Sequence, residues 1–385
     1  MNKKSVLFVL PSLDPGGAEY QTIDICNVLQ NEYEVYLLIL SGDGPLSKDI
    51  QLSPQNIFVL GSPFSVVSFK NVSFKIFFST IRDIAVLIKD HEIETVMANL
   101  PISHFLLRIT KFLFPFRKFK LVNVHHSQQF KARQRSLGKK IFDRFNNLLS
   151  LMVDNLNIFV SKASLKDSFE HFYYQRSKIK VIHNGSKIPN ELKISDPFMK
   201  IRNHKESYSI VLAGRLVQEK GHLFFLKAIE KLVYNKKISN TIELYIIGDG
   251  PLSETIYNFV HDSSLENIHL LGQKPKDELP QYFSAADLVV IPSLSEGFGL
   301  IAVEAIFSGA TVLASDTGGL KEIISDGING FSFKSNDPDS LQEHMIQIVN
   351  NGMKVDIEQA KDHTKKEFAF DVMLNKYKKV IDGTK

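Results

Sequence analysis

Short apolar runs alternate with longer amphipathic segments through nearly all of this 385-residue chain. Such a rhythm predicts strands that are buried on both faces and joined by crossover helices. In the first half of the chain, we expect strands at 6–10, 35–40, 57–60, 95–98, 121–125, 156–160 and 180–183. In the second half, we expect them at 209–213, 243–247, 268–271, 288–291 and 311–314. The pattern predicts an α/β chain with two doubly wound parallel sheets.

The length of the chain favours two domains. A single hydrophobic core rarely serves 385 residues. The alternating pattern breaks at 184–186 and stays polar to about 207. We therefore expect a first domain over 1–195 and a second domain over 196–365. Because doubly wound sheets bind ligands beyond the carboxyl ends of their strands, we also expect these Rossmann-like domains to face each other across a cleft.

Composition places the chain among folded globular proteins. Hydrophobic residues make up 44% of the chain and charged residues 23%, which argues against a disordered protein. The single cysteine, Cys26, excludes an intramolecular disulfide and lies in an apolar run that predicts burial. The apolar run 5–10 is too short for a secretory signal, and no window approaches the roughly 18 apolar residues that span a bilayer. We expect a cytoplasmic protein without a metal-binding cluster of Cys and His.

The segment 292–304 carries two glutamates on either side of a Gly-Phe-Gly turn. The turn joins the strand expected at 288–291 to a helix-like run over 300–307. A helix N-terminus can hold a phosphate, because its N–H groups are unpaired and its dipole end is positive. A carboxylate can accept hydrogen bonds from two sugar hydroxyls at once. The segment therefore predicts a sugar-nucleotide site that includes Glu296, Gly297, Phe298, Gly299, Leu300 and Glu304.

Two cations, Arg215 and Lys220, lie in the loop that follows the first strand of the expected second domain. A guanidinium and an ammonium group suit a diphosphate, whose charge grows as it leaves in a transition state. A solvated charged loop is the alternative. The position of this loop at the carboxyl end of a strand, in the same domain as Glu296, favours the diphosphate.

Glycine turns follow other expected strands. The turn 248–250 and Gly272 are ordinary turn chemistry on their own, although such turns can also form the walls around a nucleotide base. Gly16 and Gly17 follow the first strand and open a helix. They make either a structural turn or a close backbone approach to a ligand. The Gly-x-Gly-x-x-Gly spacing of a dinucleotide site is absent here.

Two adjacent histidines, His125 and His126, end the strand expected at 121–125. A histidine in this position can donate a hydrogen bond to a sugar hydroxyl or take part in proton transfer. Because side chains alternate along a strand, only one of the two can face a ligand. A purely structural role is the alternative.

A basic segment lies between Arg108 and Arg144, with eleven Lys or Arg residues and one acid, Asp143. Aromatic residues are interleaved with the basic ones over 109–120. Such a segment predicts a peripheral contact with an anionic membrane. A solvated face over a core helix is the alternative. The net charge of only +4 argues against nucleic acid as a partner.

Taken together, these motifs resemble those of family-4 glycosyltransferases of the GT-B fold. The matching residues follow one another in the right order over nearly the whole chain: Gly16-Gly17, His125, Asn184-Gly185, Gly214-Arg215, Glu219-Lys220-Gly221, Gly248-Asp249-Gly250, Glu296 and Glu304. The glutamate pair with the Arg/Lys loop is specific, whereas the glycines only support it. The family usually has an aspartate two residues after the Asn-Gly pair, and this chain has Ser186 and Lys187 there.

The resemblance implies a role for each matched residue. Arg215 and Lys220 hold the donor diphosphate and stabilise its departure, Glu296 contacts the donor sugar, and Glu304 contacts the ribose. The resemblance also implies that the amides of the Gly-Phe-Gly turn lie near sugar and phosphate. His125, which follows its strand as the family's histidine does, is expected near the transferred sugar.

By the same resemblance, Gly16 and Gly17 lie near the phosphates or the acceptor. The resemblance further implies retention of anomeric configuration and catalysis without a metal or other cofactor. A C-terminal helix over about 366–385 is expected to pack back on the first domain.

The leading hypothesis is a retaining hexosyltransferase that takes a nucleoside diphosphate sugar, a UDP-sugar, as donor. Its acceptor is a glycan or a lipid-linked glycan in bacterial surface polysaccharide or lipopolysaccharide synthesis, at the inner face of the cytoplasmic membrane. Two alternatives are a sugar-nucleotide epimerase of the same fold and a non-catalytic sugar-nucleotide-binding subunit. A membrane-surface adaptor leaves the second domain unexplained.

Overall fold

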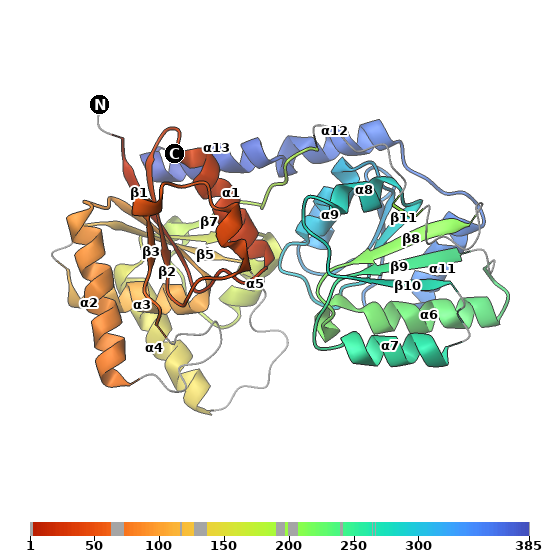
Figure 1. Ribbon diagram of the computed structural model, residues 1–385, viewed down its shortest axis with the longest axis horizontal. Helices are drawn as coiled ribbons and strands as arrows, with labels where there is room; N and C mark the ends of the chain where they lie inside the picture. The colour runs from red at the N-terminus through yellow and green to blue at the C-terminus, as the bar shows by residue number, and fades with distance from the viewer. Residues whose placement is uncertain are drawn as a thin grey trace. The chain divides into compact units, whose positions relative to one another are not determined.

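The computed structural model describes residues 3–62, 73–115, 118–126, 137–189, 197–198, 207–238, 242–263, 265 and 267–384. The chain divides into two compact units: Met1–Ile182 with Leu374–Lys385, and His183–Met373. Each unit is built on one parallel sheet covered by helices (Figure 1). The predicted α/β class with two doubly wound sheets is confirmed. The boundary that the sequence predicts at 195/196 lies outside the described residues, and the units divide earlier, after Ile182.

The first unit contains a seven-stranded sheet in the order β3-β2-β1-β4-β5-β6-β7. Its strands are β1 (Ser5–Leu10), β2 (Glu34–Ile39), β3 (Ile57–Val59), β4 (Thr95–Asn99), β5 (Lys120–His125), β6 (Leu156–Phe159) and β7 (Ile179–Val181). Every residue of β1 is buried, as expected for a central strand that is covered on both faces. The strand order reverses between β1 and β4, so the topological switch point of this sheet lies between their carboxyl ends.

Helices cover the first sheet on its two faces. They are α1 (Gly17–Leu29), α2 (Phe74–Asp90), α3 (Leu100–Leu113), α4 (Leu137–Val153) and α5 (Lys162–Phe169), with short 3-10 turns at Pro45–Asp49, Pro54–Asn56 and Arg176–Lys178. α2, α3 and α4 lie on one face, where Ile84, Leu106 and Leu149 share a hydrophobic core with Leu7 and Val9 (Figure 1). The predicted burial of the single cysteine, on α1, is also confirmed.

The second unit contains a six-stranded sheet in the order β10-β9-β8-β11-β12-β13. Its strands are β8 (Tyr208–Ala213), β9 (Ile242–Ile247), β10 (Ile268–Gly272), β11 (Leu288–Ile291), β12 (Val312–Ser315) and β13 (Phe331–Phe333). The sequence does not predict β13, because its middle residue is a serine and Phe331–Phe333 forms no apolar run. The order reverses between β8 and β11, so the switch point lies between these two central strands.

The helices of the second unit follow the strands in alternation. They are α6 (His222–Tyr234), α7 (Ser253–Asp262), α8 (Leu279–Ser284), α9 (Leu300–Phe307), α10 (Leu320–Ile323), α11 (Pro338–Val349) and α12 (Ile357–Phe368), with a 3-10 turn at Gln218–Lys220. Within the described ranges, none of the helices in either unit combines the length and the hydrophobicity needed to cross a bilayer.

The C-terminal helix expected over about 366–385 corresponds to α13 (Phe370–Asp382), and a separate helix, α12, precedes it. α12 ends at Phe368, and α13 begins two residues later. Between them, Ala369 is extended. The N–H of Ser186 donates to the carbonyl of Phe368 over 3.0 Å, and the N–H of Phe370 donates to the carbonyl of Ser186 over 2.9 Å. The last turns of α13 pack on the first unit, where Nζ of Lys378 lies 2.6 Å from Oε1 of Glu32.

Candidate active site

The predicted cation and carboxylate of the second unit form an ion pair. Lys220 ends the 3-10 turn that follows β8, and Glu296 lies in the loop between β11 and α9. Nζ of Lys220 is 2.6 Å from Oε2 of Glu296, and the hydroxyl of Ser293 donates to the same oxygen over 3.3 Å. Both charged side chains are partly buried, with 30% of Lys220 and 12% of Glu296 exposed.

Backbone contacts hold the two loops of this ion pair together. The N–H groups of Leu294 and Ser295 donate to the carbonyl of Glu219 over 2.8 and 3.3 Å. Gly221 has a φ of +71°, and a Cβ there would lie 1.9 Å from the carbonyl oxygen of Pro292. Only glycine allows the loop after β8 to approach the loop after β11 this closely. Gly221 is therefore a structural requirement of the ion pair, beside the charge that Lys220 supplies.

The pair lies at the switch point of the second sheet. β8 and β11 are hydrogen-bonded neighbours, and their following loops leave in opposite directions along the sheet. Ligands of doubly wound sheets bind in the crevice at such a point. Arg215, also in the loop after β8, is exposed, and no hydrogen bond or ion pair of its side chain occurs in the part of the chain that the structure describes. One cation at this edge is therefore neutralised by Glu296 and another is available to an anion.

The turn between the two glutamates has a buried anchor. Gly299 (φ +99°) is the N-cap of α9, which begins at Leu300. The ring of Phe298 is buried 5.9 Å from the ring of His183 and 5.8 Å from that of Phe368. Phe298 can therefore reach a ligand only through its backbone, and the same limit holds for Gly297. Glu304 is half-buried on α9.

A second glycine pair, absent from the predicted site, supports the Glu296 loop. Gly318 and Gly319 follow β12, and a Cβ on Gly318 would lie 1.7 Å from the carbonyl oxygen of Glu296. The N–H of Gly319 donates to that same carbonyl over 3.3 Å. The sequence does carry this pair, because Gly-Gly comes four residues after the end of the strand expected at 311–314. Its importance depends on a close approach from another loop, which no local pattern reveals.

The other glycine turns of this unit pack on one another. The N–H of Leu216 donates to the carbonyl of Asp249, and that of Gly248 donates to the carbonyl of Gly272, each over 2.9 Å. A Cβ on Gly248 would lie 2.0 Å from the carbonyl oxygen of Gly214. The loops after β8, β9 and β10 therefore form one continuous edge beside the Lys220–Glu296 pair. Among the described residues, no group of three His, Cys, Asp or Glu side chains is arranged to hold a metal ion.

In the first unit, Gly16 and Gly17 lie between β1 and α1, beside the switch point of that sheet. Neither has a positive φ. A Cβ on Gly17 would meet no atom within 4 Å, and one on Gly16 would meet only the flexible end of Glu19. The fold of this unit therefore does not require glycine at these positions.

His125 is buried at the end of β5 and is held on three sides. Its Nε2 donates to Oδ1 of Asn157 over 3.0 Å, and its ring stacks on Phe159 at 4.4 Å and lies 4.7 Å from the ring of His104. Burial lowers the pKa of His125 to about 4, so the ring is neutral at pH 7. A neutral ring with so low a pKa is a weak base, and this favours hydrogen bonding over proton transfer as its role.

His126 points to a different neighbour. Its Nε2 lies 2.9 Å from Oδ1 of Asn99, the last residue of β4, and its Nδ1 is buried without a partner in the described residues. Burial, followed by the nearby His125, lowers the pKa of His126 to about 3. Asn99 thus joins the ends of β4 and β5, beside the switch point between β1 and β4, and the sequence does not indicate this contact.

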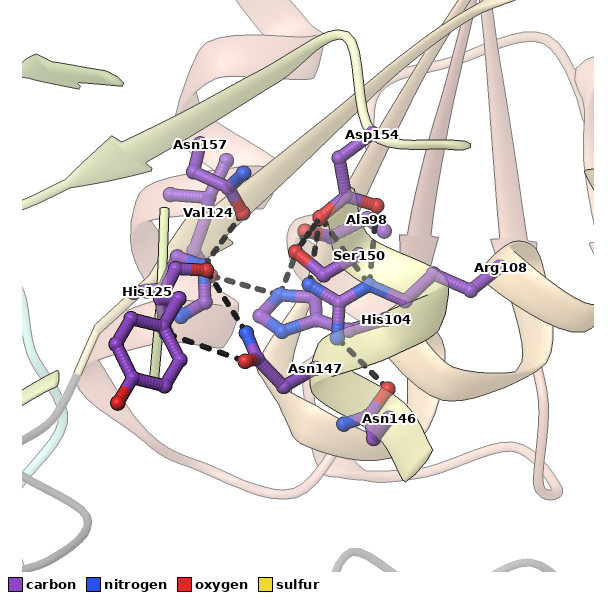
Figure 2. Close-up of polar contacts among 11 residues, drawn as sticks. Ala98, His104, Arg108, Val124, His125, Asn146, Asn147, Ser150, Asp154 and Asn157 are labelled. Atoms are coloured by element: carbon purple, nitrogen blue, oxygen red, sulfur yellow. Dashed lines mark hydrogen bonds and ion pairs between the residues drawn. The ribbon is translucent and has the colours of Figure 1, made fainter. Parts of the chain in front are cut away.

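A buried polar network lies behind His125 (Figure 2). Arg108 on α3 forms a two-pronged ion pair with Asp154, with an Nη2–Oδ2 distance of 2.7 Å, and donates to Asn146 over 2.8 Å. Ser150 donates to Asp154 over 2.6 Å. Nε2 of His104 lies 3.1 Å from the backbone carbonyls of both Ala98 and Val124. The network fixes the ends of β4 and β5 against α3 and α4.

Two family models match this chain. The model described as Glycosyltransferase Family 4 matches residues 15–187, and the model described as Glycosyl transferases group 1 matches residues 194–366. Together they span most of the sequence, with one match in each half. The chain belongs to the family-4 glycosyltransferases. The family predicted from the motifs is therefore confirmed.

This family-4 chain has both curated and structural relatives. An uncharacterized glycosyltransferase of Methanocaldococcus jannaschii is 38% identical over 141 residues, which are 37% of this chain and 38% of the relative. The Escherichia coli UDP-Gal:alpha-D-GlcNAc-diphosphoundecaprenol alpha-1,3-galactosyltransferase is 26% identical over 237 residues, 60% of each chain. The crystal structure of Anabaena HepE in complex with UDP and glucose matches 99% of this chain and 100% of that one, with a TM-score of 0.80 and 20% identity. The fold is GT-B.

The Asn-Gly pair of this glycosyltransferase lies at the start of the second unit. A Cβ on Gly185 would lie 2.7 Å from the carbonyl oxygen of Ala369, so glycine is needed for the bridge between Ser186 and the α12–α13 junction. Nearby, Nε2 of His183 lies 2.9 Å from Oε2 of Glu322 on α10. The matched pair therefore has a structural explanation that does not depend on the aspartate missing after it.

Proposed function

We propose that this family-4 glycosyltransferase transfers a sugar from a UDP-sugar to a glycan or lipid-linked acceptor, with retention of anomeric configuration. The observation that carries the proposal is the Lys220–Glu296 pair at the switch point of the second sheet, with an Nζ–Oε2 distance of 2.6 Å. The pair brings together a group that binds phosphate and a group that binds sugar hydroxyls. The printed name of the Escherichia coli relative, with its UDP-Gal and diphosphoundecaprenol, supports this choice of donor and acceptor.

In the resting protein, Lys220 and Glu296 neutralise each other. When a sugar diphosphate binds, its charges compete for Lys220, and Arg215 adds a second cation that no protein carboxylate occupies in the described residues. Glu296 is then released to accept hydrogen bonds from the sugar. Donor binding thus exchanges one ion pair for two complementary contacts, and this exchange couples recognition of the phosphate to recognition of the sugar.

The transfer itself breaks the bond between the anomeric carbon and the diphosphate oxygen. A bond forms from the acceptor oxygen to the same carbon, and the proton of the acceptor hydroxyl passes to the departing diphosphate oxygen. Negative charge grows on the departing UDP, and the fixed cations Arg215 and Lys220 stabilise it. Glu304 holds the ribose, and the backbone of the Gly-Phe-Gly turn lies along the sugar and the phosphates.

In the first unit, we assign His125 to the transferred sugar. Because Nε2 of His125 donates its hydrogen bond to Oδ1 of Asn157, Nδ1 of the neutral ring is left as an acceptor for a hydroxyl. Gly16 and Gly17 lie on the acceptor or phosphate path. We place the reaction in the cytoplasm, at the membrane face where lipid-linked acceptors of surface polysaccharide or lipopolysaccharide synthesis are exposed.

A panel of nucleotide sugars in a thermal-shift assay tests the donor assignment, because a ligand that binds only the native state raises its stability. We expect UDP-sugars to raise the midpoint, and Lys220→Ala to abolish most of the shift. Incubation of the selected donor with and without acceptor then separates the alternatives. An epimerase releases an altered sugar nucleotide without acceptor, a binding subunit turns over nothing, and a transferase requires both substrates.

A further inference from the structure

Helix α4 exposes four large apolar side chains. Ile141, Phe145, Leu148 and Met152 are 61%, 48%, 56% and 58% exposed. Their spacing of four, three and four residues places them on one side of the helix. On another side of the helix, Leu149 is buried in the core of the first unit. α4 therefore carries two apolar surfaces, and one of them faces solvent from Ile141 to Met152.

The exposed surface cannot be buried by a rotation of α4. Arg108 of α3 donates to Asn146 on α4 and pairs with Asp154 directly after it, and Ser150 donates to the same carboxylate (Figure 2). The ring of Phe142 also packs 4.8 Å from that of Phe105 on α3. These contacts fix the inner side of the helix, so the apolar stripe remains outside in the folded unit.

Positive charge flanks the stripe. Lys140 and Arg144 are exposed, and each directly precedes a stripe residue, Ile141 or Phe145. Asp143 follows Ile141 by two positions and so lies on the opposite side of the helix, at about 100° per residue. Among the described side chains of α4, the charges beside the stripe are therefore cationic. A helix face that combines large apolar groups with Lys and Arg is typical of attachment to an anionic membrane surface.

Three basic side chains in the first part of 108–144, the segment over which the sequence predicts a membrane contact, have partners within the fold. Arg108 is buried in its ion pair, Lys111 donates to the carbonyl of Phe119 over 2.8 Å, and Lys120 donates to the carbonyl of Val380. These basic groups are engaged within the fold. Residues 116–117 and 127–136 of the segment lie outside the described residues.

We propose that the outer face of α4 lies in the surface of an anionic lipid bilayer. The stripe Ile141, Phe145, Leu148 and Met152 enters the boundary between headgroups and acyl chains, and Lys140 and Arg144 contact lipid phosphates. A second copy of the chain fits this surface less well. A symmetric contact would place the same cationic flank on both partners, with no acid on the outer side of α4 to meet it.

The position of α4 links this surface to the acceptor. α4 follows β5, so in a parallel sheet it begins at the edge where the strands end and where His125 lies. Attachment through α4 would hold that edge close to lipid-linked acceptors. This last step rests on the proposed function, whereas the membrane attachment of the helix does not.

Co-sedimentation of the full chain with vesicles tests the proposal. The probes are phosphatidylcholine vesicles with and without phosphatidylglycerol, in the absence of donor and acceptor. We expect the chain to bind the anionic vesicles, and Phe145→Ser combined with Leu148→Ser to lower the bound-to-free ratio about tenfold or more, because two large apolar groups are then lost from the interface. Lys140→Gln combined with Arg144→Gln should remove the preference for phosphatidylglycerol.

Matched controls come from exposed residues of the second unit. Tyr234→Ser with Tyr257→Ser removes comparable exposed rings, and Lys227→Gln with Lys231→Gln removes two exposed cations. Both should leave vesicle binding unchanged, and all variants should keep the melting temperature of the parent. Equal vesicle binding by the Phe145/Leu148 variant would overturn the proposal. So would a lipid-free dimer that this variant converts to a monomer. Neither result would bear on whether a UDP-sugar binds the second unit.

Discussion

Gly318 approaches Glu296 so closely that a Cβ on the glycine would lie 1.7 Å from the glutamate's carbonyl oxygen. The loop after β12 thus packs against the backbone of the loop that carries Glu296, the partner of Lys220. Since Glu296 is set by this contact and by the close approach of Gly221 to Pro292, its position depends on two glycines that contribute no chemistry of their own. Backbone packing therefore positions Glu296 in the site, and the charge of Lys220 acts on a residue that is already placed.

Substitution of Gly318 by Ala should therefore damage activity more than its size suggests. The new methyl group forces the Glu296 backbone to move, and a displacement of about 1 Å at a reacting group can cost about a hundredfold in rate. Steady-state kinetics with the selected donor would measure the loss of kcat. Gly327→Ala is the matched control, because Gly327 has a similar positive φ of +73° and no atom within 4 Å of its Cβ position. It should cost about 1 kcal/mol of stability and leave kcat near the parent value. Equal kinetics for the two variants would contradict the positioning role.

Lys220→Ala should remove about 2 kcal/mol or more of transition-state stabilisation, about a thirtyfold loss in kcat/KM. The reason is the loss of one oriented cation from the departing diphosphate, together with the release of Glu296 from its partner. The control is Lys227→Ala, an exposed lysine on α6 whose loss should not change turnover. Turnover that survives the Lys220 substitution would remove the diphosphate assignment, while leaving the family and the fold in place.

Arg108 and Asp154 test whether the network behind His125 is structural. Removal of one partner of a buried ion pair leaves an uncompensated charge, which typically costs about 3–5 kcal/mol. Arg108→Leu should therefore lower the free energy of unfolding in urea by about that amount. Arg82→Leu offers the comparison, because the Arg82–Asp83 pair is exposed, with an Nη2–Oδ1 distance of 3.6 Å, and exposed pairs contribute about 0–1 kcal/mol. If both variants lose equally little stability, then solvent or a local rearrangement compensates the charge that remains on Asp154.

Periodicity and strand-end position were sufficient to predict the α/β class, the two sheets and the loops that carry Arg215, Lys220 and Glu296. Both predictions rest on local rules, because apolar runs of about five residues mark buried parallel strands and ligands collect at the strands' carboxyl ends. The pairing of Lys220 with Glu296 could not be derived in this way. It depends on β8 and β11 being neighbours across a reversal of strand order, which no stretch of sequence encodes by itself.

The two histidines illustrate the same limit. Alternation along β5 predicts that His125 and His126 point to different neighbours, but the neighbours themselves, Asn157 and Asn99, come from β6 and β4. The apolar stripe of α4 could not be found from periodicity either, because the helix has apolar residues on two sides. The contacts of Arg108 and Phe105 with the helix show which side is held inside.

The buried histidine His125 predicts that stability falls in mild acid. Its pKa is lowered from 6.5 to about 4 in the folded chain, mainly by burial. As the pH falls below about 6.5, the unfolded chain therefore binds a proton that the folded chain does not, and the free energy of unfolding decreases until about pH 4. At about 1.36 kcal/mol per pKa unit, this single group accounts for at most about 3 kcal/mol of the loss. Urea unfolding from pH 7 to pH 4.5 should show a shallower decline in His125→Asn than in the parent, whatever the variant's stability at pH 7. His261→Asn, at an exposed position on α7, should keep the parent's decline, and an equal decline in all three proteins would rule out His125 as its source.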